Sequence, residues 1–177
     1  KCPHDSIRQK MVMLSESRRD DGIIPVRSVM ENASLASLER IIYKGYTHKA
    51  EEKKSVKESF DKMHVKTPTL DTAISTLSGG NQQKVIIGRS LLTKPDVLIL
   101  DEPTRGIDVG SKSEIYKIIN QLAKEGMSVL MVSSETPELL GTCDRILVVS
   151  GGKIVGEFDP KVATQADLMH AAFSAVS

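Results

Sequence analysis

The sequence contains no tryptophan and few aromatic residues of any kind. Aromatic residues make up 3% of its 177 positions, and 24 Lys and Arg are almost balanced by 23 Asp and Glu. Proteins that bind nucleic acid usually combine excess positive charge with aromatic side chains on which bases stack. The composition therefore argues against nucleic acid as the main partner of this chain.

Cysteine and long apolar runs are also scarce. Cys2 and Cys143 are the only cysteines, too few for a disulfide framework, so we expect two free thiols. Cys2 lies near His4, but no second ligand pair follows, which argues against a zinc site. No apolar run reaches the ~18 residues of a spanning helix, and no signal peptide is recognisable. Because position 1 is not Met, we expect an excised piece of a longer protein or a processed form.

What the sequence does contain is a regular alternation of short apolar segments and amphipathic ones. Strands are predicted at 11–14, 96–100, 128–133, 144–150 and 153–158, and helices at 4–9, 29–41, 49–64, 80–93, 111–125, 136–141 and 164–174. This alternation predicts an α/β fold with a mostly parallel sheet and helices on both faces. Residues 27–76 interrupt it as a helical insertion, residues 15–22 are predicted as a loop, and the last two strands as a hairpin.

The segment LSGGNQQK, residues 77–84, predicts a helix whose first turn faces an anion. Ser78 is a favourable N-cap residue. Gly79 and Gly80 have no side chains where a backbone must approach a ligand closely. The free N–H groups and the positive dipole end of the helix would then attract a phosphate. A glycine-rich helix start can also be an ordinary cap, so the glycines alone do not decide the matter.

The segment DVLILDEPT, residues 96–104, predicts a buried strand that ends in two carboxylates. The carboxyl ends of parallel strands are where open α/β sheets bind ligands. Asp101 could hold Mg²⁺, directly or through water, and Glu102 could orient or deprotonate an attacking water. Two solvated carboxylates at a strand end are the plain alternative.

The two segments, about 20 residues apart, resemble the signature and Walker B motifs of ABC-type ATPases. The resemblance extends to RGID at 105–108, which is similar to the D-loop, and implies a P-loop NTPase-like fold. It divides residues 1–177 into a helical subdomain at 27–76, a signature and Walker B core at 77–160 and a C-terminal helix at 161–177. The sequence is most similar to the second ATPase domain of bacterial monosaccharide importers. The galactose and methyl galactoside group is favoured, with ribose, xylose and arabinose relatives left open.

The resemblance also implies the chemistry and the partners. In the family two ATPase domains hold two ATP molecules between them, and hydrolysis drives a transporter. It implies nucleotide contacts from Ser78, Gly79, Gly80, Asn81, Gln82 and Asp108, and Mg²⁺ binding by Asp101. It implies a twin ATPase domain and transmembrane permease subunits as partners, with a sugar-binding protein as an indirect one. The expected location is the cytoplasmic face of the bacterial cell membrane, as a peripheral subunit.

Three departures from the family pattern limit these expectations. No G-x-x-x-x-G-K-[ST] loop occurs, so we expect the Walker A strand and loop to lie upstream of residue 1. Ser134 stands at the switch-histidine position of the catalytic site, where a hydroxyl cannot become charged near neutral pH. Glu16 stands at the Q-loop position, where it could bind Mg²⁺ but cannot donate a hydrogen bond as glutamine does.

The missing strand leads to a structural expectation and to two alternative functions. In the sheet order that the resemblance implies, it lies between the 128–133 and the 144–149 strands, so its absence would leave two unpaired edges and favour self-association. For the isolated chain, weak ATP binding and a non-enzymatic, dimerising fragment are expected. An ABC ATPase of nucleic-acid repair or translation is the other alternative. The sequence does not specify the sugar.

Overall fold

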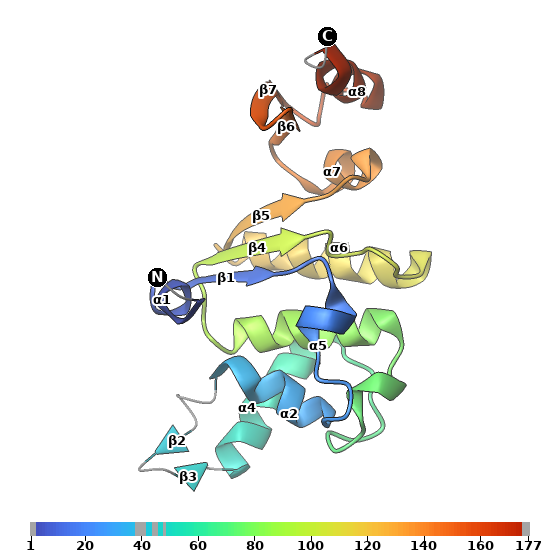
Figure 1. Cartoon of the computed structure of the whole chain (residues 1–177). Coiled ribbons are helices and arrows are strands. Elements are labelled where there is room, and N and C mark those ends of the chain that lie inside the picture. Colours follow the sequence, from blue (N-terminus) through green and yellow to red (C-terminus); the bar gives the residue numbers. More distant parts are fainter. Residues whose placement is uncertain (1–2, 38–41, 44–45, 48, 175–177) are drawn as a thin grey trace. The chain divides into compact units, whose positions relative to one another are not determined.

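A computed structural model describes residues 3–37, 42–43, 46–47 and 49–174 of the chain. The chain forms two compact units, Lys1–Leu130 and Met131–Ser177. The first unit contains α1 (Pro3–Arg8), β1 (Met11–Leu14), α2 (Val29–Ser34), β2 (Ile42–Tyr43), β3 (Tyr46–Thr47), α4 (Lys49–Met63), α5 (Gly79–Leu91), β4 (Val97–Asp101) and α6 (Val109–Lys124); β5 (Ser128–Val132) runs across the division (Figure 1).

The central sheet has the strand order β1-β4-β5, and β1 and β4 are parallel. Their register pairs Met11 with Val97 and Leu14 with Leu100, so both strands end at the same edge of the sheet. Leu14, Leu98 and Leu100 are almost fully buried. The apolar segments predicted at 11–14 and 96–100 are therefore strands that bring the residues after them together.

Part of the apolar sheet surface is exposed in the described structure. Met13 is paired with Ile99, next to the buried Leu98 and Leu100. Successive side chains of a strand point to opposite faces, so Met13 belongs to the face opposite these leucines. Met13 is 59% exposed, and Leu130 in β5, where exposure alternates, is 54% exposed. Both residues are exposed apolar side chains on strands of the central sheet.

Helix α5 lies at the centre of the first unit. It contacts α2, α4, α6 and β1, and its Val85 and Ile87 are buried. Helix α6 turns one apolar face inward, as its periodicity predicts; the buried residues are Ile115, Ile118, Ile119 and Leu122. Because so many elements contact α5, its direction fixes where its N-terminal turn points.

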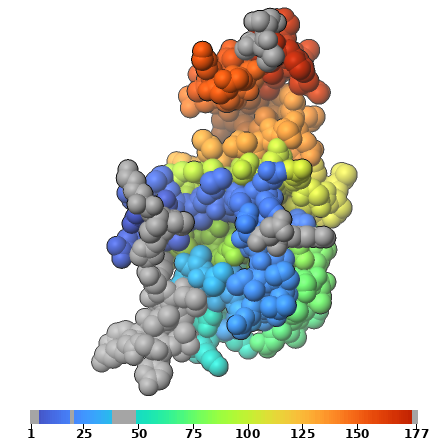
Figure 2. All heavy atoms as spheres, viewed as in Figure 1, coloured from blue at the N-terminus to red at the C-terminus, as the bar shows by residue number. Residues whose placement is uncertain are grey.

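Helix α2 is anchored to the segment that precedes α5. Ser28 and Glu31 form a capping box at its start, with both reciprocal hydrogen bonds present. The buried Asn32 side chain accepts from the Ile24 N–H and donates to the Ile24 carbonyl. Ser28 bridges to Ala73, and the space-filling view shows the blue and green segments in continuous contact (Figure 2).

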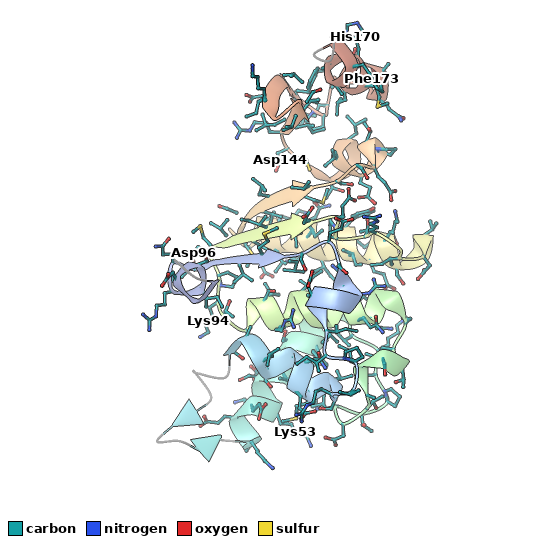
Figure 3. The ribbon with its side chains drawn as sticks, in the orientation of Figure 1. Lys53, Lys94, Asp96, Asp144, His170 and Phe173 are labelled. Atoms are coloured by element: carbon teal, nitrogen blue, oxygen red, sulfur yellow. The ribbon has the colours of Figure 1, made fainter. Side chains whose placement is uncertain are left out.

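The second unit contains α7 (Thr136–Thr142), β6 (Ile146–Ser150), β7 (Lys153–Phe158) and α8 (Gln165–Ser174). Strands β6 and β7 form the predicted antiparallel hairpin. Gly151 and Gly152 have φ values of 55° and 76°, the left-handed pair that a tight I′ turn requires. Ile146, Val148 and Leu168 form the core under α8, while Phe173 on α8 is 66% exposed (Figure 3).

Several local expectations need correction or extension. The loop predicted at 15–22 contains a π-helical turn, Arg18–Gly22. The helix predicted at 29–41 ends at Ser34 and continues as a 3₁₀ turn, Leu35–Ser37; positions 38–41 lie outside the described residues. The short pair of strands β2 and β3 was not predicted, because two-residue strands have no detectable periodicity.

Two expectations about the sheet and the membrane can be compared directly with the structure. Among the described strands, β5 pairs only with β4 and β6 only with β7, so the two expected unpaired edges are confirmed. Within the same residues no helix is long and apolar enough to cross a membrane. The subdivision at 27–76, 77–160 and 161–177 stays a prediction; α8 packs on β6 and β7.

Candidate functional site

The N-terminal turn of α5 has the features of an anion site. Ser78 is its N-cap, and its side-chain oxygen accepts from the Asn81 N–H. A Cβ added to Gly79 would lie 3.1 Å from Nη2 of Arg18, so a guanidinium group lies beside the helix start. A helix dipole and an arginine together favour a phosphate at this place. Sequence analysis missed Arg18, although the run SRRDDG preceding Ile23 offered it.

Gly80 is required by packing as well as by any ligand. A Cβ added there would lie 2.5 Å from both Cβ and Oγ of Ser111 on α6, a distance at which neither backbone could stay in place. The first turns of α5 and α6 therefore touch at this glycine. The sequence interpretation assigned Gly80 to the approach of a ligand and did not foresee this contact.

Asn81 and Gln82 make hydrogen bonds within the protein. The Asn81 side chain accepts from the Lys66 N–H at 2.8 Å and donates to Ser78 Oγ at 3.0 Å. Gln82 is buried, and its amide donates to the Ile74 and Leu77 carbonyls. Both side chains thus hold the segment before α5, and Gln82 is directed into the interior.

Asp101 and Glu102 lie at the carboxyl edge of the sheet, as predicted. Glu102 has a φ of 46°, in the left-handed region that costs a residue with a Cβ about 1–3 kcal/mol. The next two residues, Pro103 and Thr104, are buried, and the Arg105 N–H donates to the Glu102 carbonyl. The buried turn therefore holds Glu102 in an unfavourable backbone conformation, which is a common property of functional sites.

Glu16 lies just beyond β1, at the same edge, and forms an ion pair with Arg105 from the loop after β4. Adjacent parallel strands explain why the two loops meet. Both side chains are about half exposed, so the pair contributes little to stability. In the part of the chain that the structure describes, no group of three His, Cys, Asp or Glu side chains is arranged to hold a metal.

Asp108 is the N-cap of α6, and its Oδ1 accepts from the Ser111 N–H at 2.9 Å. This backbone hydrogen bond is the main reason that the pKa of Asp108 is lowered from its ordinary value. The residue that the sequence assigned to a nucleotide is therefore also a helix cap, placed next to the contact between Gly80 and Ser111.

Ser134 belongs to the second unit, where it follows β5. Its neighbour Ser133 donates to Glu138 Oε2 at 2.8 Å and accepts from the Glu135 N–H, which fixes the turn into α7. Cys143 ends that helix, and burial together with nearby Asp144 raises the pKa of its thiol. A thiol of this kind is less reactive than an exposed one.

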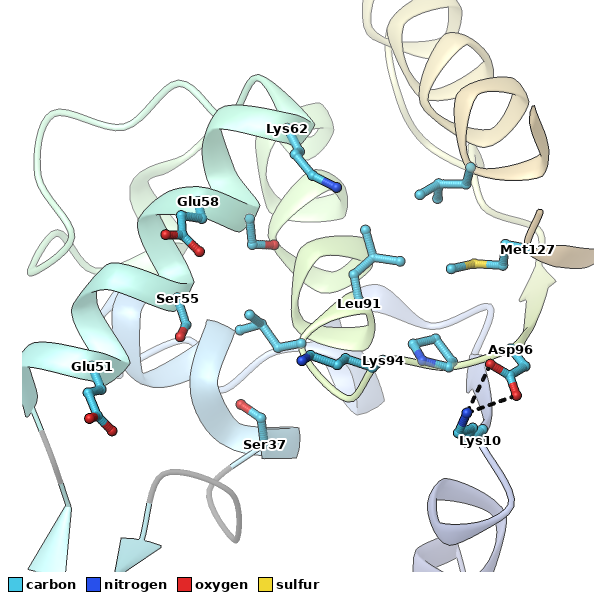
Figure 4. Close-up of a pocket in the computed structure, with 14 residues that line it drawn as sticks. Lys10, Ser37, Glu51, Ser55, Glu58, Lys62, Leu91, Lys94, Asp96 and Met127 are labelled. Carbon is cyan, nitrogen blue, oxygen red and sulfur yellow. Dashed lines mark hydrogen bonds and ion pairs between the residues drawn. The ribbon is translucent and has the colours of Figure 1, made fainter. Parts of the chain in front are cut away.

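A separate cavity of about 700 Å³ lies at the opposite end of the strands (Figure 4). Lys10 and Asp96, which precede β1 and β4, form an ion pair at 3.2 Å on its wall. Glu58, Lys62 and Lys94 also line it. Since it adjoins neither Asp101 nor the start of α5, this cavity is distinct from the candidate site.

Comparisons with known proteins connect the chain to a family. A family model described as ABC transporter matches residues 2–105. The xylose import ATP-binding protein of Photobacterium profundum is 51% identical over 171 residues, 97% of this chain and 34% of the relative. A putative ribose/galactose/methyl galactoside import ATP-binding protein of Pseudomonas syringae pv. syringae is 48% identical over 170 residues. The match covers 96% of this chain and 32% of the relative.

The chain thus spans about a third of the length of these curated relatives. Among solved structures, a dimeric ATP-binding cassette with ADP and Pi matches with a TM-score of 0.73 and 23% identity, over 88% of this chain and 66% of that one. A nucleotide-free cassette from an ABC transporter matches with a TM-score of 0.75 and 22% identity, over 90% of this chain and 64% of that one. These similarities show the fold, and the expected P-loop NTPase-like α/β class is confirmed.

Proposed function

Because this chain belongs to the ABC transporter family, we propose that it is part of an ATP-hydrolysing subunit that drives the import of a monosaccharide. The observation with most weight is the identity of about 50% to sugar import ATP-binding proteins along almost the whole chain. The positions of the helix start and of the two strand-end carboxylates agree with it. The names of these relatives include several sugars, so the proposal stops at the class of monosaccharides.

In this proposal the start of α5 binds the terminal phosphate of a nucleotide held by a twin domain. The anion would meet the backbone N–H groups of Ser78, Gly79 and Gly80, with Arg18 beside Gly79. Such preformed donors stabilise the charge of a transferring phosphoryl group. Gln82 is left out of the nucleotide contacts because its amide is turned to buried carbonyls.

The carboxyl edge of the sheet serves the other nucleotide, on the chain's own side. Glu102 would orient the attacking water or accept its proton. Carboxylate oxygens are the ligands that Mg²⁺ prefers, so Asp101 suits this ion, and Glu16 could join it if its ion pair with Arg105 opens. Mg²⁺ bound here would neutralise charge on the phosphates. Asp108 remains a candidate for nucleotide contact, and Ser134 remains a candidate for the switch position.

The partners of the whole protein follow from the same proposal. They are the twin ATPase domain, permease subunits in the membrane and, indirectly, a sugar-binding protein. The subunit would act at the cytoplasmic face of the membrane, with residues 27–76 as the docking part. Near-neutral charge gives no support to the alternative of a nucleic-acid or ribosome ATPase, which salt-dependent binding to either would revive.

The test is Glu102→Gln in the whole subunit. We expect ATP turnover to fall by at least about tenfold, because a general base typically contributes about 10²–10⁴-fold to the rate. The amide keeps the shape of the side chain but cannot accept a proton. Glu157→Gln, an exposed change on β7, is the matched control and should leave turnover unchanged. If Glu102→Gln also leaves turnover unchanged, this site does not perform hydrolysis.

A further inference from the structure

Lys84 combines a charged group with nearly complete burial. It lies one helical turn after Gly80, and its side chain is 2% exposed. Its ammonium donates to the His64 carbonyl at 3.1 Å and to Glu114 Oε2 at 2.5 Å. The hydrogen bond from Lys84, followed by its charge, lowers the pKa of Glu114. Helix α5 therefore has an ionic contact with α6 in which the lysine is buried and the Glu114 side chain is 45% exposed.

The Lys84 contacts join three helices close to the candidate site. His64 ends α4 with a φ of 49°, and its carbonyl is the one that Lys84 reaches. On α6, Glu114 lies one turn after Ser111, which touches Gly80. Helices α5 and α6 are thus in contact at two successive turns, first through a glycine without a side chain and then through an ion pair.

A buried lysine is rarely the most stable choice for such a place. Taking an ammonium out of water is costly, and apolar residues of similar size often stabilise a fold as well or better. The pair instead fixes the position of α5 along α6. The hydrogen bond from Lys84 to Glu114 can form only when the two helices are in this register. A sliding of one helix by a single turn would break it.

We propose that Lys84 is a positioning residue that, through Glu114, couples the two nucleotide half-sites on this chain. The start of α5 serves the nucleotide of the twin domain, while the segment Asp101–Asp108 leads from the chain's own carboxylates into α6. The Lys84–Glu114 pair connects the helix of one half-site to the helix of the other. This inference rests on the proposed function, because only a two-nucleotide enzyme has two half-sites to couple.

The test compares three variants in the whole subunit. Lys84→Met keeps the length of the side chain but removes its charge, and Lys84→Arg keeps the charge. Lys10→Met is the matched control, because Lys10 also makes an ion pair, to Asp96 at 3.2 Å, with both side chains largely exposed and outside the proposed docking part. Turnover and KM for ATP are measured, together with amide hydrogen exchange at residues 79–84 and 109–114.

We expect Lys84→Met to lower kcat for ATP by about tenfold, the effect of a misplaced phosphate donor, with KM changed by less than about twofold. Lys84→Arg should recover most of kcat, and Lys10→Met should match the wild type. Amide hydrogen exchange should increase at the starts of both α5 and α6 in Lys84→Met, and in neither of the other two variants. A purely structural lysine would give no selective loss of kcat once the variant is folded.

Two results would overturn the inference. One is a folded Lys84→Met variant with wild-type kcat. The other is increased exchange at α5 while the first turn of α6 is unchanged, which would show that the helices are not coupled. If the wild-type subunit itself does not hydrolyse ATP, the proposed function fails separately, and the exchange at α6 still decides whether Lys84 links the two helices.

Discussion

Gly80 shows how one position can satisfy two requirements at the scale of a residue. Its lack of a side chain exposes the backbone N–H groups of the first turn of α5, and it also lets Ser111 of α6 approach. The second requirement can be tested without any nucleotide, because it concerns only the distance between two helices.

Gly80→Ala should lower the free energy of unfolding by about 1–3 kcal/mol, the usual cost of overpacking. The added methyl group would lie 2.5 Å from the Ser111 side chain. Urea unfolding measures the change. Gly141→Ala is the control, since a Cβ there meets nothing within 4 Å. Adding Ser111→Gly to Gly80→Ala should recover part of the loss, and no recovery would mean that the clash is elsewhere.

Asp108 should make stability depend on pH through its cap on α6. Its pKa is lowered in the folded state, so its contribution is present above the unfolded pKa of about 3.9 and is lost as pH falls through the folded value. Asp108→Asn keeps a capping oxygen without the titration. We expect the variant to lose less stability than the wild type on acidification, measured by urea unfolding at successive pH values; parallel curves would contradict this.

At the scale of elements, periodicity and turn residues were sufficient for most of the fold. The apolar runs at 97–100 and 129–132 became strands, and the glycine pair at 151–152 became the hairpin turn. The site residues at 78–80 and 101–102 lie where helix-start and strand-end arguments placed them. Contacts between elements were not predictable in this way: Arg18 beside Gly79, Ser111 against Gly80 and Lys84 with Glu114 all depend on how helices pack.

The exposed Leu130 on β5 leads to a prediction about association. Leu130→Lys should weaken self-association of the 177-residue chain by about tenfold or more, because burying a leucine contributes about 1.5–3 kcal/mol. Sedimentation at several concentrations measures this. Val26→Lys is the control, since Val26 is also exposed, at 86%, in a loop away from the sheet. If Leu130→Lys associates as the wild type does, the unpaired edges of β5 and β6 remain the other route.

At the scale of the whole molecule, the proposed function gives the chain two half-sites for nucleotides, while its sequence has no Walker A motif. That loop usually supplies many of the N–H groups that surround the phosphates. We therefore expect the 177-residue chain to bind Mg-ATP more weakly than micromolar, measured by calorimetry. Micromolar binding would show that Arg18 and the start of α5 are sufficient by themselves.

The left-handed backbone at Glu102 has an evolutionary consequence. Glycine and, to a lesser degree, asparagine adopt such a φ at little cost, so either would relax the turn while it removed the carboxylate. The backbone strain at this position therefore favours such a replacement, and selection for activity opposes it. A duplicated copy released from that selection would be expected to lose its glutamate early and to become more stable as it does so.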